Sequence, residues 1–247
     1  MYNLLIALAA GSAAFMGGWL FVNTVVSGII PGTLVLFITY FMLARRTGRK
    51  LQALMEQAMA EFQAQRVEKG RKMIESGFAL GRWQFMVSGQ LHAQLGAIAY
   101  MQRDFKSART HLSKSWGRNW HAQAMLSCID HREKKHSDAI ERMGKAKGGG
   151  KKDPLYWGLY AFLAKEGGDS TRALQVLGEA LKKHENSDAL KTQDYAYRNK
   201  KKFKPKAFAP TWYQFFPEQM PRSMQMAYGQ AQQGQRRGGY SFPHPRR

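Results

Sequence analysis

The first 44 residues contain no Asp, Glu, Lys or Arg, although the chain of 247 residues carries 38 Lys+Arg and 17 Asp+Glu. Two apolar stretches occupy this segment, residues 4–22 and residues 25–44. As a helix, the first stretch is about 28 Å long, which is close to the ~30 Å thickness of a membrane's hydrocarbon core. We therefore expect a transmembrane helical hairpin over residues 1–44.

The second stretch leaves an alternative open because it contains Pro31. A helix that begins at Pro31 would contribute only 14 apolar residues before Arg45, which is short for a span. Two full spans are the favoured interpretation, and a re-entrant second segment is the alternative. A cleaved signal peptide is disfavoured, since the first residues carry no Lys or Arg.

The charges that follow the hairpin predict its orientation. Arg45, Arg46, Arg49 and Lys50 come directly after the second stretch, and Lys and Arg near span ends stay on the cytoplasmic side. We expect both termini in the cytoplasm and, for the chain as a whole, a place in a membrane such as the bacterial inner membrane.

Small residues line one side of the first stretch, which allows another helix to approach closely. That helix is either the second span or a helix of another membrane protein. The small residues are Ala7, Ala10, Gly11, Ala14 and Gly18.

Residues 45–198 are rich in strong helix formers and contain an internal repeat. Ala108, Ala139 and Ala173 occupy equivalent places, 31 and 34 residues apart, and Gly70 lies 38 residues before the first of them. The sequence KAKGGGKKDP, residues 145–154, predicts a flexible joint between the last two units. It is not a phosphate-binding loop, because Lys145 and Lys152 replace the required glycine and hydroxyl residue.

This spacing resembles that of the tetratricopeptide-repeat family, in which each unit is a helix pair of about 34 residues. Small residues Gly96, Ser127 and Ala161 of the first helices would face the small residues of the second helices. Only Trp157 matches the family's early tryptophan; His92 and Gln123 occupy that place in the other units. The resemblance implies an all-α solenoid over roughly residues 65–185.

Candidates for chemistry are few. Cys128 and His131 are three residues apart and would share a helix face, but the sequence fixes no further metal ligands. A nucleophilic Cys128 would also need an oxyanion pocket, for which there is no candidate. We expect no enzyme activity, no metal and no cofactor.

The family resemblance implies a groove lined by the first helix of each unit. Such an apolar floor with basic rims suits a protein partner, namely a peptide or helix that carries acidic residues. The groove positions are Gln90, Tyr100, Met101, His121, Cys128, His131, Arg132, Leu155, Phe162 and Lys165.

Residues 199–247 form a basic tail with ten Lys/Arg and a single acid, Glu218. Its low aliphatic content predicts a largely disordered segment. The tail could be a passive extension, contact anionic lipid headgroups with Trp212, Tyr213, Phe215 and Phe216 at the interface, or bind nucleic acid. Its candidate contact residues are Lys200, Lys201, Lys202, Lys204, Lys206, Arg236 and Arg237.

Together these features predict a membrane-anchored, tetratricopeptide-like scaffold or adaptor that holds a partner protein at the cytosolic membrane face. The alternative is a membrane-tethered nucleic-acid-binding or ribosome-associated factor, which the net charge of +21 favours. The expected domains are a transmembrane hairpin (1–44), a helical repeat domain (45–198) and the basic tail (199–247).

Overall fold

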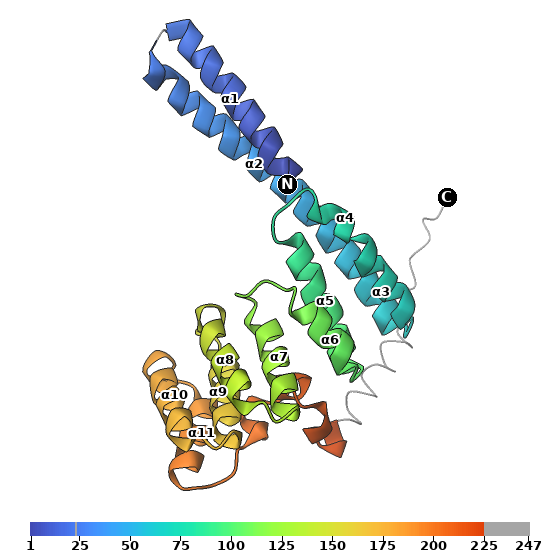
Figure 1. Cartoon of the computed structure of the whole chain (residues 1–247), viewed down its shortest axis with the longest axis vertical. Coiled ribbons are helices and arrows are strands. Elements are labelled where there is room, and N and C mark those ends of the chain that lie inside the picture. Colours follow the sequence, from blue (N-terminus) through green and yellow to red (C-terminus); the bar gives the residue numbers. More distant parts are fainter. Residues whose placement is uncertain (23, 225–247) are drawn as a thin grey trace, which may run out of the picture. The chain divides into compact units, whose positions relative to one another are not determined.

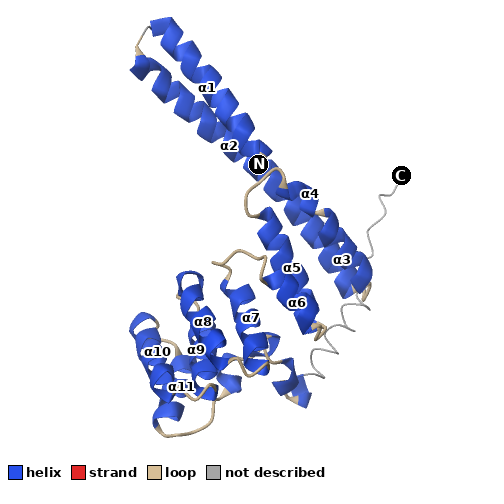
Figure 2. Ribbon diagram, viewed as in Figure 1, coloured by secondary structure: helices blue, strands red, loops and turns tan. Residues whose placement is uncertain are grey.

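The computed structural model describes residues 1–22 and 24–224, and every regular element in these ranges is a helix (Figures 1 and 2). The predicted all-α class is confirmed. Two compact units divide the chain, residues 1–126 and residues 127–247, with the division inside helix α7 (Trp120–Arg132). Each unit is described by itself below.

The first unit begins with two long apolar helices and continues with shorter ones. Before α7 it contains α1 (Tyr2–Val22), α2 (Val25–Gln63), α3 (Val67–Ser76), α4 (Phe78–Gly81), α5 (Val87–Met101) and α6 (Phe105–Leu112).

Helices α1 and α2 pack side by side as a hairpin (Figure 1). Glycines make the contact: a Cβ added to Gly32 would lie 2.9 Å from Phe15 Cβ and 3.1 Å from the Gly11 carbonyl oxygen. The Ser27 hydroxyl donates a hydrogen bond to the Gly18 carbonyl oxygen at 2.9 Å. The predicted stripe of small residues is therefore used within the hairpin.

Helix α2 passes through Pro31 without interruption, because it begins at Val25 and Pro31 is only its seventh residue. Its apolar part thus extends from Val25 to Ala44, beyond the 14 residues of the shorter alternative. The same helix continues to Gln63 and buries Leu51 and Ala58 in the core of the first unit.

The second unit is built around α9 (Pro154–Glu166), in which every residue from Leu155 to Ala164 is buried. Helices α8, α10 and α11 contact it. The remaining elements are α8 (His136–Gly150), α10 (Ser170–Lys183), α11 (Asp188–Arg198) and three 3-10 helices, η1 (Pro205–Phe208), η2 (Thr211–Gln214) and η3 (Pro217–Gln219).

The predicted flexible joint at residues 145–154 is largely helical, so this prediction is wrong. Helix α8 continues to Gly150, and only residues 151–153 form a turn before α9. A Cβ added to Gly150 would lie 2.3 Å from the Tyr156 ring. The glycine is therefore needed for close packing of α8 on α9 rather than for flexibility.

One turn geometry recurs at the ends of five helices, α2, α5, α7, α9 and α11. In each turn one residue adopts a left-handed backbone conformation, and the next N–H donates to the carbonyl five residues back, at 2.8–3.0 Å. This is the Schellman type of helix end. The left-handed residues are Gln65, Arg103, Lys134, Gly168 and Lys200, with φ between 54° and 89°.

The recurring turns have the same spacing as the repeat in the sequence. Gln65, Arg103, Lys134 and Gly168 are 38, 31 and 34 residues apart, and each lies five residues before one of the small residues that mark the repeat. The small residues Gly70, Ala108, Ala139 and Ala173 are all buried.

The start of the basic tail is folded, and the prediction of disorder is wrong for this part. We call residues 199–224 the C-terminal segment. It contains the three 3-10 helices, and the side chains of Phe208, Trp212, Tyr213, Phe215 and Phe216 are buried. These aromatic residues therefore form core contacts in the second unit instead of the expected membrane-interface surface.

Candidate functional site

The groove positions expected in the second unit lie together, but the chain's own C-terminal segment covers them. Phe162 on α9 is only 8% exposed. Its ring makes edge contacts with Phe203, Trp212 and Phe216, at centroid distances of 5.0, 5.2 and 5.2 Å. An aromatic ring buries 150–250 Å² when enclosed, so these contacts hold the segment firmly on α9.

Arg132, at the end of α7, binds the same segment. Its guanidinium donates to the Glu218 carboxylate at 2.6 Å and to the Phe215 carbonyl oxygen at 3.4 Å, and it lies 5.5 Å from the centre of the Phe216 ring. Arg132 thus binds an acidic residue, as the resemblance implied, but that residue belongs to this chain.

Lys165 is also engaged within the second unit. Its ammonium group donates to the Ser170 hydroxyl at 2.9 Å and lies 5.7 Å from the centre of the Tyr197 ring. Burial raises the pKa of the Tyr197 hydroxyl well above its usual value. The apolar and basic groups of the expected groove are therefore parts of one internal packing arrangement.

The remaining predicted positions of the second unit are inside it. Cys128 is fully buried and Leu155 is 6% exposed. His131 Nδ1 lies 3.2 Å from His136 Nδ1, and burial, followed by the charges of His136 and Arg132, lowers the His131 pKa. Within the described residues, no group of three His, Cys, Asp or Glu side chains could hold a metal ion.

In the first unit the predicted positions have different surroundings. Tyr100 is 1% exposed and packs against the Phe105 ring, so it lines no groove. Met101 is exposed, and His121 lies against the Trp120 ring with centroids 3.8 Å apart. Gln90 is the predicted residue that lines an open recess of the first unit.

This recess, which we call the α5 recess, has a volume of about 430 Å³. Arg118 and Trp116 are exposed beside Gln90, and Trp120 is largely buried. Two tryptophans on either side of an arginine are a signal that sequence analysis could have used. The lining residues are Met86, Gly89, Gln90, Ala93, Gln94, Trp116, Arg118, Asn119 and Trp120.

The basic run of the C-terminal segment is exposed on the second unit. The backbone N–H of Lys204 donates to the Gln193 side-chain oxygen at 3.0 Å, and Lys201 lies over the Tyr195 ring. Arg236 and Arg237 lie outside the described residues. The exposed side chains are Lys200, Lys201, Lys202, Lys204 and Lys206.

No protein-family model matches this chain, and no curated protein or solved structure matches it either.

Proposed function

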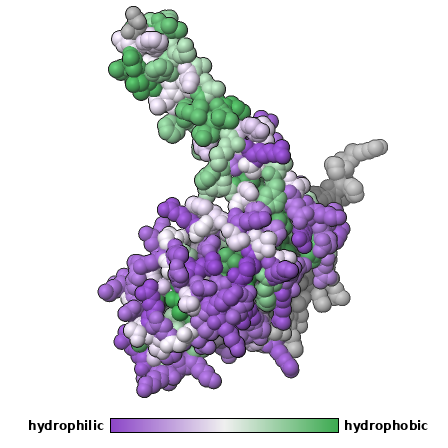
Figure 3. Space-filling view, viewed as in Figure 1, coloured by the Kyte–Doolittle hydropathy of each residue, from purple (hydrophilic) through white to green (hydrophobic). Residues whose placement is uncertain are grey.

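We propose that the protein is a non-enzymatic helical scaffold that is anchored in a membrane by α1 and α2 and binds a partner protein beside that membrane. The observation that carries the proposal is the exposure of large apolar side chains around the hairpin (Figure 3). Phe21 is 93% exposed, Leu20 72% and Phe37 68%. Lipid would remove this surface from water at a gain of about 25 cal/mol per Å².

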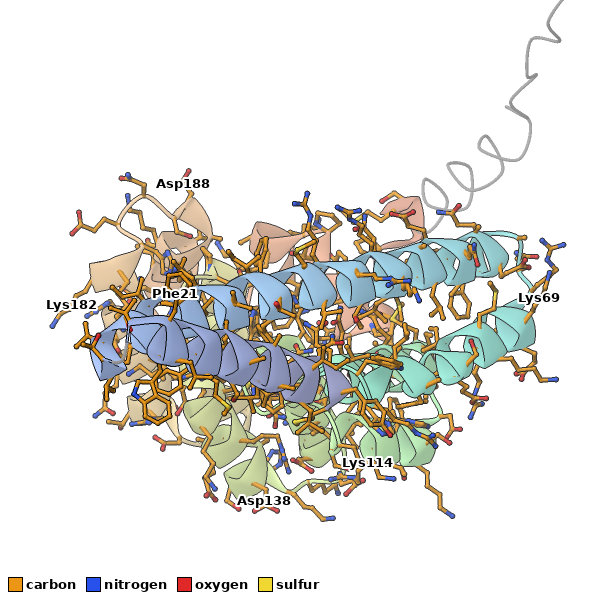
Figure 4. The ribbon with its side chains drawn as sticks, turned by 90° about the horizontal axis from the view of Figure 1, so that it is seen from above. Phe21, Lys69, Lys114, Asp138, Lys182 and Asp188 are labelled. Atoms are coloured by element: carbon orange, nitrogen blue, oxygen red, sulfur yellow. The ribbon has the colours of Figure 1, made fainter. Side chains whose placement is uncertain are left out.

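The length of the two helices supports a full crossing. Helix α1 has 21 residues, and the apolar part of α2 is of similar length, as about 20 residues are needed for a span. Figure 4 shows Phe21, near the hairpin turn, and Lys69, at the start of α3, toward opposite ends of α2. In the proposed arrangement these two residues lie on opposite sides of the membrane.

The orientation rests on charge. Arg45, Arg46, Arg49 and Lys50 follow the apolar part of α2 directly, and such residues are retained in the cytoplasm. We therefore place the helical body on the cytoplasmic face, for example of a bacterial inner membrane.

We also propose that the body is a tetratricopeptide-like repeat array. The proposal is supported by the five equivalent helix ends and by the buried small residues that follow four of them. Repeat proteins of this kind stack helix pairs and use the resulting surface for binding. A binding role, rather than catalysis, follows from that architecture.

The partner-binding surface that we propose is the α5 recess of the first unit. Its tryptophans offer apolar area, and Arg118 offers a bidentate donor for a carboxylate. Arg132 and Lys165, the basic residues of the expected groove, already have intramolecular partners. A peptide or helix that carries an acidic residue is the ligand that fits the α5 recess.

Membrane topology can be tested with single cysteines in the full-length protein, since the native Cys128 is buried. The protein should resist extraction by carbonate. A membrane-impermeant maleimide should reach Cys introduced at Phe21 only from the non-cytoplasmic side, and at Lys69 only from the cytoplasmic side. Release by carbonate, or labelling of both positions from one side, would contradict the anchor.

Partner binding can be tested with a photo-crosslinker at position 90 in intact membranes, with the exposed Lys106 on α6 as the matched control position. We expect one protein to cross-link at position 90 and not at 106. Arg118→Glu should reduce its recovery at least about tenfold, the effect of losing a charge-assisted hydrogen bond. Equal cross-linking at both positions would contradict the α5 recess as the site.

The second candidate function is binding of a nucleic acid, which the five exposed lysines of residues 200–206 favour. Stacking on Trp212 or Phe216 is not part of this candidate, because both rings are buried. Replacing Lys202 and Lys206 with Gln should then weaken RNA retention and its salt dependence, whereas Arg118→Glu should not. Partners that are lost on nuclease treatment would favour this function over the scaffold.

A further inference from the structure

A recess of about 150 Å³ lies in the first unit where the apolar hairpin meets the helical body. We call it the hairpin-base recess. It is formed by the start of α1, the middle of α2, and α4 with the loop that follows it. The lining residues are Asn3, Leu43, Arg46, Thr47, Lys50, Leu80 and Trp83.

The floor of this recess is fixed by buried polar contacts. The Asn3 side chain is 1% exposed and donates to the Thr47 hydroxyl, which is also buried, at 3.0 Å. The backbone N–H groups of Tyr2 and Asn3 donate to the carbonyl oxygens of Arg82 and Trp83, at 3.0 and 3.1 Å. These bonds tie the start of α1 to the loop after α4, so the recess is preformed.

The walls combine two cations with apolar surface. Leu43, Arg46, Thr47 and Lys50 follow one another at intervals of three and four residues, and they therefore share one face of α2. Leu43 is the next to last residue before the first charge of the chain. The recess thus has an apolar side toward the hairpin and a basic side toward the body.

The two cations have no acidic neighbour in the sequence, since Glu56 is the first acidic residue of the chain. Both side chains are exposed, and the described part of the structure contains no ion pair for either of them. A bound anion would supply the missing countercharge, and a phosphate group accepts hydrogen bonds from an arginine and a lysine at once.

The size and level of the recess indicate which anion it takes. Its volume equals that of about five water molecules at ~30 Å³ each, which suits a phosphate group rather than a whole lipid. In the proposed membrane anchor it lies at the headgroup level. Trp83 is 43% exposed there and packs edge-on against Tyr2, 5.3 Å away, as interfacial aromatic residues do.

We propose that the hairpin-base recess binds the phosphate of one anionic glycerophospholipid, with its acyl chains along Leu43 and the hairpin. This inference rests on the proposed membrane anchor. Arg46 and Lys50 hold the phosphate oxygens, and the Trp83 ring covers the glycerol region. A zwitterionic lipid fits less well, because its ammonium group would find no carboxylate in this part of the chain.

The test uses the full-length protein, purified in detergent and titrated with phosphatidylglycerol or phosphatidylcholine, with lipid retention measured by native mass spectrometry. The variant is Arg46→Gln/Lys50→Gln. The matched control is Arg45→Gln/Arg49→Gln, which removes the same charge from the same turns of α2 but from residues that do not line the recess.

We expect the wild type to bind one phosphatidylglycerol at least about tenfold more tightly than phosphatidylcholine. The recess variant should lose about thirtyfold in this affinity because two charge-assisted hydrogen bonds disappear. The control should lose about threefold, since only the general attraction of the surface is weakened. Inorganic phosphate at about 10 mM should not displace the lipid.

Three results would overturn the lipid site: equal losses in both variants, equal retention of the two lipids, or displacement by inorganic phosphate, which would identify a site for the free ion. Carbonate extraction of the same variants from membranes separates the two proposals. Resistance in all of them, together with any of these results, would overturn only the lipid site. Extraction of the wild type would overturn the anchor itself.

Discussion

Arg132 and Glu218 form an ion pair at 2.6 Å although 86 residues separate them in the chain. Glu218 is the single acid among residues 199–247, and the side chain that it binds belongs to the groove that was expected to bind an acidic peptide. The C-terminal segment therefore occupies its own domain in the way that a ligand would. Any partner for this face of the second unit would first have to displace the segment.

The first prediction concerns the energy that holds the C-terminal segment. Trp212 is fully buried, so Trp212→Ala should lower the free energy of unfolding by about 3–5 kcal/mol. Glu218→Gln should cost about 1 kcal/mol or less, because the ion pair is partly exposed. Lys206→Ala, at an exposed position in the same segment, is the control and should change little. Denaturant unfolding of the full-length protein measures all three.

A Trp212→Ala protein as stable as the wild type would show that the segment is only loosely held. If Glu218→Gln were the more damaging change, charge rather than aromatic packing would hold the segment. Either result would contradict the arrangement around Phe162.

The sequence was sufficient for the helical class, the hairpin and the repeat spacing because each depends on local pattern. A charge-free stretch of 44 residues and small residues at 31- and 34-residue intervals can be read without a structure. The turns at Arg103, Lys134 and Gly168 have those same intervals. Helix ends are set by neighbouring residues, and so their spacing is visible in the sequence.

The C-terminal segment could not be predicted in this way. Its composition is poor in aliphatic residues, which argues for disorder when the segment is considered alone. Its aromatic rings are instead buried against Phe162 and Tyr197, which are distant in sequence. For the same reason the sequence could place Arg132 and Lys165 on the second unit but could not show that the chain supplies their partners.

A second prediction tests the recurring turns. Gly168 has φ +89° in open space, so Gly168→Ala should destabilise by about 1–2 kcal/mol, the cost of a left-handed residue with a Cβ. Gly178, inside α10, also faces open space, but its backbone is helical. Gly178→Ala should therefore stabilise by about 1 kcal/mol. Lys134→Gly should stabilise slightly, since it relieves the same strain.

These three variants are compared by thermal unfolding at one protein concentration. Opposite signs for the two Gly→Ala changes are the expected outcome. If both changes stabilised the protein, the turn at Gly168 would not be left-handed, and the equivalence of the helix ends would fail.

The third prediction addresses the small residues of the repeat. Ala139 and Ala173 are 1% and 0% exposed, so Ala→Leu at either position should overpack the helix contacts and cost roughly 1–3 kcal/mol. Ala58 is also buried, so it is no suitable control. Ala53, exposed on α2, is suitable, and Ala53→Leu should change the free energy of unfolding by less than about 0.5 kcal/mol.

Equal tolerance of leucine at positions 53, 139 and 173 would show that the marker residues are not at close helix contacts. Circular dichroism of each variant separates a local packing defect from loss of the helical fold.

The last prediction is a loss of stability in mild acid. His92 on α5 and His111 on α6 place their Nδ1 atoms 3.1 Å apart, which requires at least one neutral ring. Burial lowers the pKa of both, and then the positive charges of His111 and Lys114 act on His92, and those of Arg71 and Lys114 on His111.

A histidine with a folded-state pKa below its unfolded value of about 6.5 stabilises the fold fully above that pH. This stabilisation is lost as the pH falls through 6.5 toward the folded-state pKa, because the unfolded chain then binds more protons. The free energy of unfolding of the full-length protein should therefore be lower at pH 5.5 than at pH 7.5. His92→Gln/His111→Gln should reduce this difference, whereas His121→Gln, at an exposed ring, should leave it unchanged. An unaltered pH dependence in the double variant would assign the acid sensitivity to other groups, of which His131 beside His136 is the next to substitute.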